Sequence, residues 1–304
     1  MRREVLASQA IWTDDTIVRM LAPLRTKNCR LWVYIGDESH PYSVYDFTTD
    51  RSRDGPEKFL AGYSGYLQAD AYGGYDGIYA GGGVVEVACM AHCRRYWWEA
   101  RTTEPRRAHE ALSFIGRLNE LEEQFRQANL KGDSLRDARQ RHAVPILDDF
   151  ESWLGDSSQR VLPKSKIAEA YRYTKNQWQA LRRYTESGVL SIENNLSERT
   201  VKIPAVGRKN WLFVGSRTGG ERAAILFSLI ATAKANGVEP QAYLTSVMKE
   251  LAKDNRDEDH LRQLLADRWL ASHPKHKWEI DELRRNERKR TRQARIAKRK
   301  RKRR

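Results

Sequence analysis

The chain has 304 residues, of which 40% are hydrophobic and 31% are charged, so it is long enough for one large core or two domains. No apolar run approaches the roughly 20 residues of a membrane-spanning helix, and residues 1–15 lack the apolar core of a secretory signal. Three cysteines, Cys29, Cys89 and Cys93, are an odd count in a long chain, which does not resemble a disulfide framework and fits a reducing compartment better. These features argue against a membrane or secreted protein and predict a cytoplasmic one.

The formal net charge of +15 is concentrated at the C-terminal end. Residues 282–304 contain fourteen Lys or Arg and two Glu, a net charge of +12, which leaves +3 for the rest of the chain. High charge and few apolar side chains predict a disordered tail. The tail either binds phosphate groups and releases their counterions, or is simply a solvated end. The sequence leaves both interpretations open.

Strands are predicted for most of residues 1–100. β-branched and aromatic residues fill three segments with turn residues between the last two, which predicts three consecutive antiparallel strands at 10–21, 30–38 and 42–50. A helix that begins at a proline is predicted over 56–63. A short buried strand ending at Asp70 and a strand that turns helical near Ala91 complete this part.

Helices are predicted for most of the remaining chain. Between Pro105 and Tyr184, apolar residues recur at spacings of three and four, as on one face of a helix. Two further helices are predicted at 219–237, between glycines, and at 239–251. The order of strands, a helical block and more helices predicts an α/β core with a helical insertion.

Three acidic positions are candidates for metal ligands. Asp14 or Asp15 lies within one predicted strand, Asp70 ends another, and Glu198 lies near the start of a predicted helix. Carboxylates that converge from strand ends and a helix can bind Mg²⁺ or Mn²⁺, which prefer oxygen ligands. Each aspartate alone is weak support, because a single Asp at a strand end is more often a turn or cap residue.

Four motifs together resemble the insertion sequence 66 family of DDE transposases: "WTDDT", "LQADAYGGY", "ACMAHCRRYWWEA" and "IENNLSERTVKIPAVGRKNWLFVGS". The resemblance extends from about Leu6 to about Leu251. It implies an α/β fold with a ribonuclease H-like core, a mixed sheet flanked by helices, and an α-helical insertion between the second Asp and the Glu. It also implies that Asp14, Asp70 and Glu198 are catalytic and hold two Mg²⁺ or Mn²⁺ ions.

With this family as a guide, the chain divides into four expected parts. Residues 1–100 form the first part of the catalytic core and 101–188 the helical insertion. Residues 189–252 complete the core with the Glu-bearing helix, and 253–304 form a C-terminal extension with the basic, disordered tail. Family members typically carry a long N-terminal segment with a cysteine-rich and a DNA-recognition part. Because about a dozen residues precede Asp14, we expect the catalytic part of a transposase, from a truncated gene or a fragment.

The departures from the family pattern are mild. Ile17 stands where Pro is usual, Glu193 where Asp is usual, and Lys202 where Arg is usual. Asp15 occupies a position where the family often has Glu. We therefore prefer Asp14 as the ligand and expect Asp15 to support it.

The segment "CMAHC" places Cys89 three residues before His92. A closed zinc site needs four ligands, and the sequence has no second pair at zinc-finger spacing. Several DDE transposases have a similar Cys-x-x-His element that supports the core near the site, and this structural role is favoured over a metal role. Arg94 and Arg95 follow, and they either contact phosphate or solvate the helix.

On a helix, Asn194 and Asn195 share a face with Glu198, whereas Glu193 falls off that face. The asparagines are interpreted as partners of the carboxylate, a metal-bound water or a phosphate, with a helix cap as the alternative. The positive and aromatic residues around them suit a DNA backbone and a splayed base: Arg199, Lys202, Arg208, Lys209 and Trp211. A strand entry with Trp211 and Phe213 in the core is an equally supported alternative for Trp211.

The leading hypothesis is a transposase that cleaves DNA at element ends with water and then joins the freed 3′ hydroxyl to target DNA. DNA is the expected partner, an oligomer on DNA is implied by the resemblance, and no membrane is involved. One alternative is a truncated or decayed relic that binds DNA without catalysis. Another is a metal-dependent nuclease of the same fold that performs no strand transfer.

Overall fold

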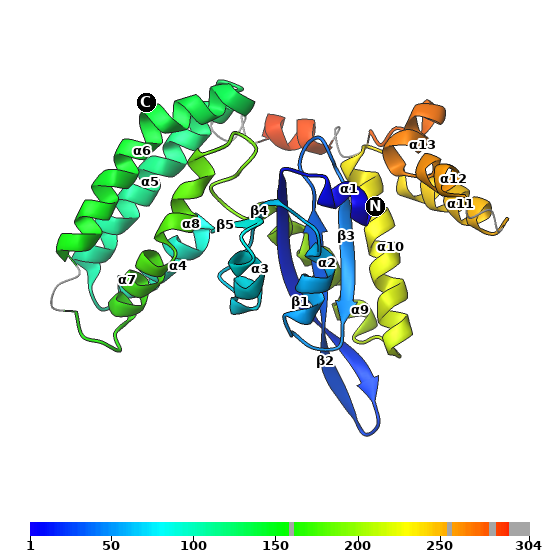
Figure 1. Cartoon of the computed structure of the whole chain (residues 1–304), viewed down its shortest axis with the longest axis horizontal. Helices are drawn as coiled ribbons and strands as arrows, with labels where there is room; N and C mark the ends of the chain where they lie inside the picture. Colours follow the sequence, from blue (N-terminus) through cyan, green and yellow to red (C-terminus); the bar gives the residue numbers. More distant parts are fainter. Residues whose placement is uncertain (158–160, 254–256, 280–283, 292–304) are drawn as a thin grey trace.

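A computed structural model describes residues 1–157, 161–253, 257–279 and 284–291. Its centre is a five-stranded sheet in the order β3-β2-β1-β4-β5 (Figure 1). β1 is antiparallel to β2 and β2 to β3, whereas β4 is parallel to both β1 and β5. The three predicted antiparallel strands and the mixed sheet are confirmed. The strands are β1 (Ala10–Ala22), β2 (Arg25–Ile35), β3 (Ser43–Thr48), β4 (Gly65–Gln68) and β5 (Val84–Val87).

Helices flank both faces of the sheet. In chain order they are α1 (Arg2–Leu6), α2 (Asp54–Leu60), α3 (Asp76–Ala80), α4 (Met90–Ala100), α5 (Pro105–Gln127), α6 (Gly132–Ser157), α7 (Lys166–Asn176), α8 (Trp178–Arg182), α9 (Asn195–Trp211), α10 (Arg217–Ala235), α11 (Pro240–Leu251), α12 (Glu258–Gln263) and α13 (Ala266–Ser272). Short 3₁₀ turns lie at Gly73–Tyr75, Arg183–Thr185 and Pro274–His276.

Alternation along the strands divides the core into two clusters. Because successive side chains point to opposite faces, Trp12 and Val33 belong to the large cluster that α4, α9 and α10 cover. Ile11 and Trp32 belong to the smaller cluster beneath α1 and α2. The same alternation places the adjacent Asp14 and Asp15 of β1 on opposite faces of the sheet.

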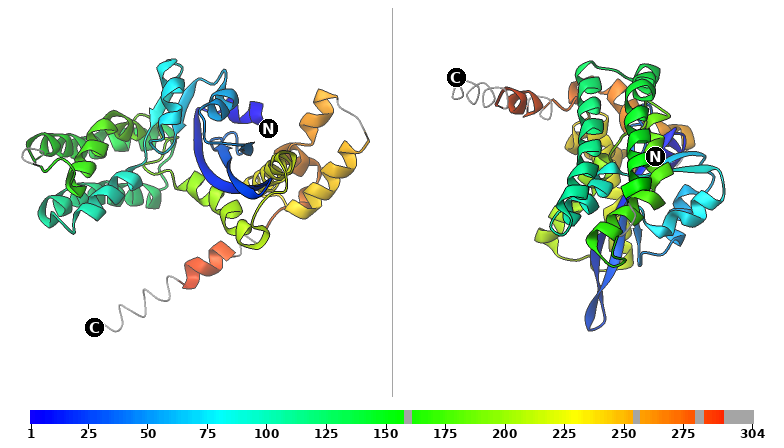
Figure 2. Two further views of the ribbon diagram at one scale, coloured as in Figure 1. Left: turned by 90° about the horizontal axis from the view of Figure 1, so that it is seen from below. Right: turned by 90° about the vertical axis from the view of Figure 1, so that its left-hand side faces the viewer.

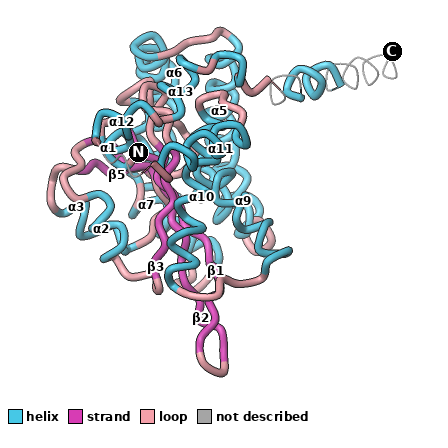
Figure 3. Tube along the Cα trace, turned by 90° about the vertical axis from the view of Figure 1, so that its right-hand side faces the viewer, coloured by secondary structure: helices cyan, strands magenta, loops and turns pink. Residues whose placement is uncertain are grey.

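The β1–β2 hairpin is longer than predicted and extends beyond the body of the molecule (Figure 3). β2 begins at Arg25 rather than near Arg30, and Ala22 pairs with Arg25 at the tip. Its first four residues are exposed. These residues are all polar, so this part of the strand lacks the alternation of apolar and polar side chains that predicts a β-strand.

The edge strand β3 is covered by α10, which replaces a missing strand partner with hydroxyl groups. Thr232 Oγ1 accepts from the backbone N–H of Ser43 at 3.0 Å and donates to its carbonyl at 3.0 Å. Ser228 Oγ accepts from the N–H of Tyr45 at 2.8 Å. Small hydroxyl residues one turn apart on α10 thus satisfy a sheet edge that would otherwise be open to another strand.

Helix α9 continues through Pro204 and Gly207, so "GRKNW" lies at the end of a helix and the alternative of a strand entry is wrong. Proline removes one intrahelical hydrogen bond, and the carbonyl of Thr200 instead accepts from Tyr45 Oη at 2.8 Å. A Cβ on Gly207 would lie 2.9 Å from Trp211 Nε1, so the glycine leaves room for that indole against the helix. Beyond α9, Val214 pairs with Met20 as an isolated parallel bridge.

The segment between α4 and α9 is helical, as its periodicity predicts, and extends to one side of the sheet (Figure 2). The buried guanidinium of Arg139 on α6 donates to Glu122 on α5 through Nε and Nη2, each at 2.8 Å. Its Nη1 donates to the carbonyls of Tyr184, Ser187 and Leu190 at 2.9–3.0 Å. Arg139 therefore fastens the α5–α6 pair to the chain that leads into α9.

A third cluster joins α10 to the C-terminal helices and includes Val238, Tyr243, Val247 and Trp269.

The expected disorder of the basic tail, 282–304, falls outside the described residues except for 284–291, which are helical and exposed. In the described ranges, no helix is long and apolar enough to cross a membrane.

Candidate active site

Parallel pairing of β1 and β4 brings Asp14 and Asp70 together. Trp12 pairs with Gln68 at the end of β4, and two residues farther along each chain are Asp14 and Asp70. Asp14 follows Trp12 by one full period of the strand, and Asp70 lies just beyond the end of β4. Both line a cavity of about 550 Å³ at this edge.

The third predicted carboxylate, Glu198, lines the same cavity from the first turn of α9. Asn194 immediately precedes that helix, and its Nδ2 donates to the carbonyl of Thr13 at 3.0 Å. This bond joins the start of α9 to β1 beside Asp14. The structure therefore brings Asp14, Asp70 and Glu198 to one cavity, although they lie in separate parts of the sequence.

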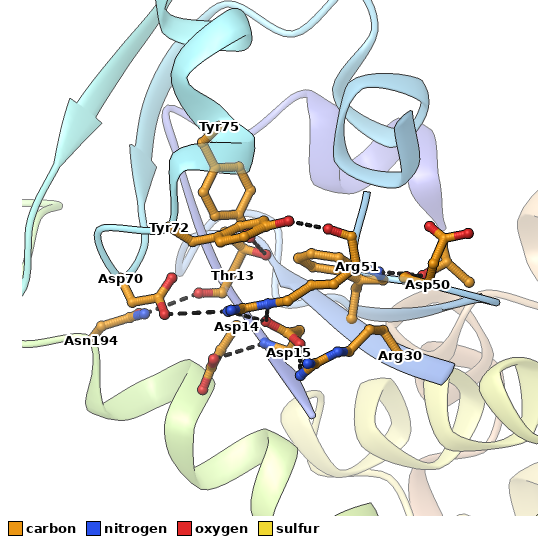
Figure 4. A network of polar contacts seen from close by, with 12 residues as sticks. Thr13, Asp14, Asp15, Arg30, Asp50, Arg51, Asp70, Tyr72, Tyr75 and Asn194 are labelled. Carbon is orange, nitrogen blue, oxygen red and sulfur yellow. Dashed lines mark hydrogen bonds and ion pairs between the residues drawn. The ribbon is translucent and has the colours of Figure 1, made fainter. Parts of the chain in front are cut away.

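The two adjacent aspartates have different partners (Figure 4). The Asp15 side chain is 3% exposed, and its oxygens accept from Arg30 Nη1 at 2.8 Å and from Arg51 Nη2 at 2.7 Å. Asp14 Oδ1 accepts from the backbone N–H of Asp15 at 2.7 Å, and no ion pair of Asp14 occurs among the described residues. Asp15 thus forms ion pairs with two arginines, whereas Asp14 lines the cavity.

Arg51, which follows β3, is a site residue that sequence reasoning missed. Its Nη2 lies 3.7 Å from Asp70 Oδ2 as well as bonding Asp15. The guanidinium lies over the Tyr72 ring at 3.9 Å from the centroid, and Tyr72 Oη donates to the Arg51 carbonyl. The polar stretch "TTDRSRDG" contains both Arg51 and Arg53, and nothing in it indicates that Arg51 will reach two carboxylates.

The electrostatics of the cavity favour a bound cation. Burial, and then the nearby Asp70, Asp15 and Glu198, raise the pKa of Asp14 to about 7, against the opposing hydrogen bond from Asp15 N–H. Burial also raises the pKa of Asp70, and the adjacent Arg51 opposes that rise. Carboxylates that resist ionisation in this way are stabilised when positive charge is supplied.

The Cys-x-x-His element lies directly against Glu198. Cys89 is buried immediately before α4, and its Sγ accepts from the backbone N–H of Asn194 at 3.2 Å. His92 Nε2 lies 3.4 Å from Glu198 Oε1. Burial, and then the charge of Arg95, lower the pKa of His92. The element therefore contacts the beginning of α9 as well as Glu198.

The paired asparagines have separate roles. Asn194 is buried at the N-cap of α9, but its side chain makes no capping bond, and its Oδ1 has no hydrogen-bond partner among the described residues. Asn195 is exposed, and its Nδ2 donates to Glu193. The structure thus places Asn194 at the site and turns Asn195 toward Glu193 rather than toward Glu198.

The predicted DNA-binding residues divide into an exposed set and a packed pair. Arg95 lines the cavity. Arg208 donates to the carbonyl of Ile17, and Trp211 is partly buried against the main core. The exposed members are Arg94, Arg95, Arg199, Lys202 and Lys209. Tyr96 and Tyr173 were not predicted as site residues. Their rings stack with centroids 4.5 Å apart, and both residues line the cavity.

Residues 1–222 match the Transposase IS66 family, and residues 228–266 match the IS66 C-terminal element. The chain belongs to the IS66 transposase family. This confirms the resemblance seen in the four motifs and extends it past Leu251. Membership supports a transposase role. Transposases as a class act on DNA, and the family generally uses divalent metals.

Among curated proteins, this IS66 chain is similar to three uncharacterized proteins of Sinorhizobium fredii. It is 31% identical to y4hP over 269 residues, which cover 82% of this chain and 49% of y4hP. It is 30% identical to y4jD over 276 residues, which cover 86% of this chain and 54% of y4jD. The chain spans about half the length of the curated relatives it matches.

Proposed function

We propose that this chain carries the catalytic centre of an IS66 transposase, which cleaves DNA at element ends and transfers the cut strand into target DNA. The observation that carries the proposal is the convergence of Asp14, Asp70 and Glu198 on one cavity from two parallel strands and a helix. The mixed sheet and the helical segment between β5 and α9 support a ribonuclease H-like assignment.

The residues present fit a divalent metal. Three carboxylates supply hard oxygen donors, the kind that Mg²⁺ and Mn²⁺ prefer. Burial raises the pKa of Asp14 to about 7, so a cation is needed for its full ionisation at neutral pH. Asn194 Oδ1, buried beside the site without a partner among the described residues, would accept a hydrogen bond from water bound to such a metal.

Asp14, Asp70 and Glu198 would hold the two ions of the proposed mechanism. When bound, such ions activate a nucleophilic oxygen and stabilise the leaving oxygen of a phosphodiester.

The protein's own cations bind and orient the DNA. Arg95 lines the cavity, where a guanidinium can form charge-assisted bonds to phosphate oxygens near the reacting bond. Lys202 and Lys209 are exposed along α9, the helix that carries Glu198. Seven residues of α-helix span about 10 Å, so these lysines extend the positive surface away from the cavity along a backbone of DNA.

The test uses a labelled duplex with the element end, in the presence of Mg²⁺. We expect cut and joined products from the wild-type chain, and we expect their loss in Asp70→Asn and Glu198→Gln. Glu193→Gln, in the same motif but turned toward Asn195, is the matched control and retains both products. Unchanged cleavage by Asp70→Asn would overturn its assignment. DNA binding by the wild type without cleavage would support the relic, and cleavage without joining would support the nuclease.

A further inference from the structure

A second set of ligand atoms lies beside the three carboxylates. Within the described part of the chain, one atom each from Cys89, His92 and Glu198 forms a group with all members within 4.8 Å of one another. Cys89 directly precedes α4, His92 lies in its first turn, and Glu198 lies in the first turn of α9. Two elements that are far apart in sequence thus meet at a sulfur, a nitrogen and an oxygen.

The nitrogen–oxygen distance in this group matches tetrahedral coordination. Zinc binds imidazole nitrogen and carboxylate oxygen at about 2.0–2.2 Å, so two such ligands at the tetrahedral angle lie about 3.4 Å apart. His92 Nε2 and Glu198 Oε1 are 3.4 Å apart. The same calculation with a zinc–sulfur bond of about 2.3 Å gives about 3.6 Å for a sulfur–nitrogen pair. The Cys89 sulfur lies within 4.8 Å of the other two ligand atoms, so a movement of side chains would bring it into that range.

The surroundings also suit a metal site. The backbone N–H of Asn194 donates to Cys89 Sγ at 3.2 Å, which is the kind of outer contact that orients a metal-bound thiolate. Asn194 also marks the start of α9, so one short segment orients the sulfur and supplies the Glu198 carboxylate. His92 and Glu198 line the cavity, which leaves a fourth position for water, as in zinc sites with three protein ligands.

We propose that Cys89, His92 and Glu198 form a binding site for a thiophilic divalent metal, with zinc as the preferred ion. The sulfur and nitrogen donors distinguish this site from the all-oxygen set that suits Mg²⁺. Glu198 belongs to both sets. An ion held by Cys89 and His92 therefore draws Glu198 away from Asp14 and Asp70. Zinc is therefore expected to inhibit Mg²⁺-dependent cleavage, a consequence that rests on the proposed function.

Metal binding is tested without any cleavage assay. The purified chain, freed of metal, is titrated with Cd²⁺ and with Co²⁺, whose thiolate complexes absorb by sulfur-to-metal charge transfer. We expect a saturable band at one metal per chain that zinc displaces and a large excess of Mg²⁺ does not. Cys89→Ser abolishes the band. Cys93→Ser is the matched control, because this thiol lies one turn along α4 against Thr174 Oγ1 at 3.3 Å, and it retains the band.

His92→Asn and Glu198→Gln provide variants that keep the buried sulfur. Each is expected to weaken Co²⁺ binding at least tenfold while circular dichroism shows a folded protein. The absence of a charge-transfer band in the folded wild type overturns the inference. A band that survives Cys89→Ser, or that disappears in Cys93→Ser, places the metal elsewhere and overturns it as well.

The two proposals fail in distinguishable ways. Asp14→Asn removes a carboxylate of the proposed magnesium site but no ligand of the zinc site, so we expect an unchanged affinity for Co²⁺. If the wild type binds Co²⁺ through Cys89 but cleaves no DNA, the zinc site stands and the proposed function fails. If cleavage occurs and zinc inhibits Cys93→Ser and Cys89→Ser equally, the inference of a shared Glu198 fails alone.

Discussion

Asp14→Asn should make the metal-free protein more stable at neutral and alkaline pH. The pKa of Asp14 is about 7 in the folded protein, against 3.8 as its ordinary value, mainly because of burial. Between these two values the folded protein binds the proton and the unfolded chain does not. The free energy of unfolding therefore falls as the pH rises, by about 1.4 kcal/mol per pH unit for this one group.

The size of the effect follows from that window. Across about three pH units the accumulated loss is about 4 kcal/mol. Water at the open side of the cavity screens part of the charge, so an effect between about 2 and 4 kcal/mol is expected. Asparagine is neutral and nearly the same shape, and its Oδ1 can still accept the bond from the backbone N–H of Asp15. The substitution therefore removes the penalty without leaving a cavity.

The assay is urea unfolding of wild type and Asp14→Asn at pH 4, 5, 6, 7 and 8, with divalent metal removed by chelation. The difference in unfolding free energy should be close to zero at pH 4, grow through pH 5 and 6, and level off above pH 7. Other titrating groups are present in both proteins and largely cancel in the difference. Adding Mg²⁺ at pH 8 should stabilise the wild type and reduce the difference, because the ion binds the folded state.

Asp15→Asn is the matched control one residue away. Asp15 is buried and accepts from Arg30 and Arg51, so its loss should destabilise the protein by about 3 kcal/mol at neutral pH. A difference for Asp14→Asn that stays constant from pH 4 to pH 8, or that shows destabilisation at pH 8, would refute the reasoning about burial and neighbouring carboxylates.

Three further predictions concern packing and DNA. Arg139→Met leaves Glu122 buried without its partner and should lower the urea-unfolding free energy by about 3–5 kcal/mol; a change below 1 kcal/mol would contradict the anchoring role. Thr232→Val leaves the backbone N–H and carbonyl of Ser43 without their hydroxyl partner. It should lower the free energy of unfolding by about 1–3 kcal/mol in the same assay, whereas an unchanged free energy would mean that water replaces the hydroxyl. The double variant Lys202→Ala, Lys209→Ala should reduce the slope of log affinity for DNA against log salt by about 2; an unchanged slope would exclude phosphate contacts by both lysines.

The pairing of the core strands could be predicted because its physical cause is local. β-branched and aromatic residues with turn residues between them mark β1, β2 and β3. The pattern missed the exposed polar start of β2 and placed its end at residue 38, whereas β2 ends at Ile35. The start of α9 near Glu198 was also predicted. Its end was not, because Pro204 and Gly207 usually interrupt a helix. The carbonyl that Pro204 leaves unpaired accepts from Tyr45 Oη, which is distant in sequence, and Gly207 makes room for Trp211 one turn along the same helix.

The site residues on β1 could be predicted because the alternation of side chains along a strand fixes their direction. The site residue in the loop after β3 could not. Asp14 and Asp15 differ by one residue, and strand alternation sends them to opposite faces, so one of the two had to face away from α9. Arg51 reaches both Asp15 and Asp70 from the chain after β3. No local pattern in the sequence indicates such a contact, because it depends on where the chain between β3 and α2 folds back over the sheet.

The arginines explain how the chain tolerates so many carboxylates at one edge of the sheet. Asp15 receives Arg30 and Arg51, and Arg51 also lies near Asp70, so two of the three aspartates have positive neighbours. Asp14 has none among the described residues and has the pKa of about 7. A protein selected for stability alone would gain by making Asp14 neutral. In the proposed metal site the charge of Asp14 would instead be stabilised by the bound cation, and the stability lost in the metal-free state would be returned when the ion binds.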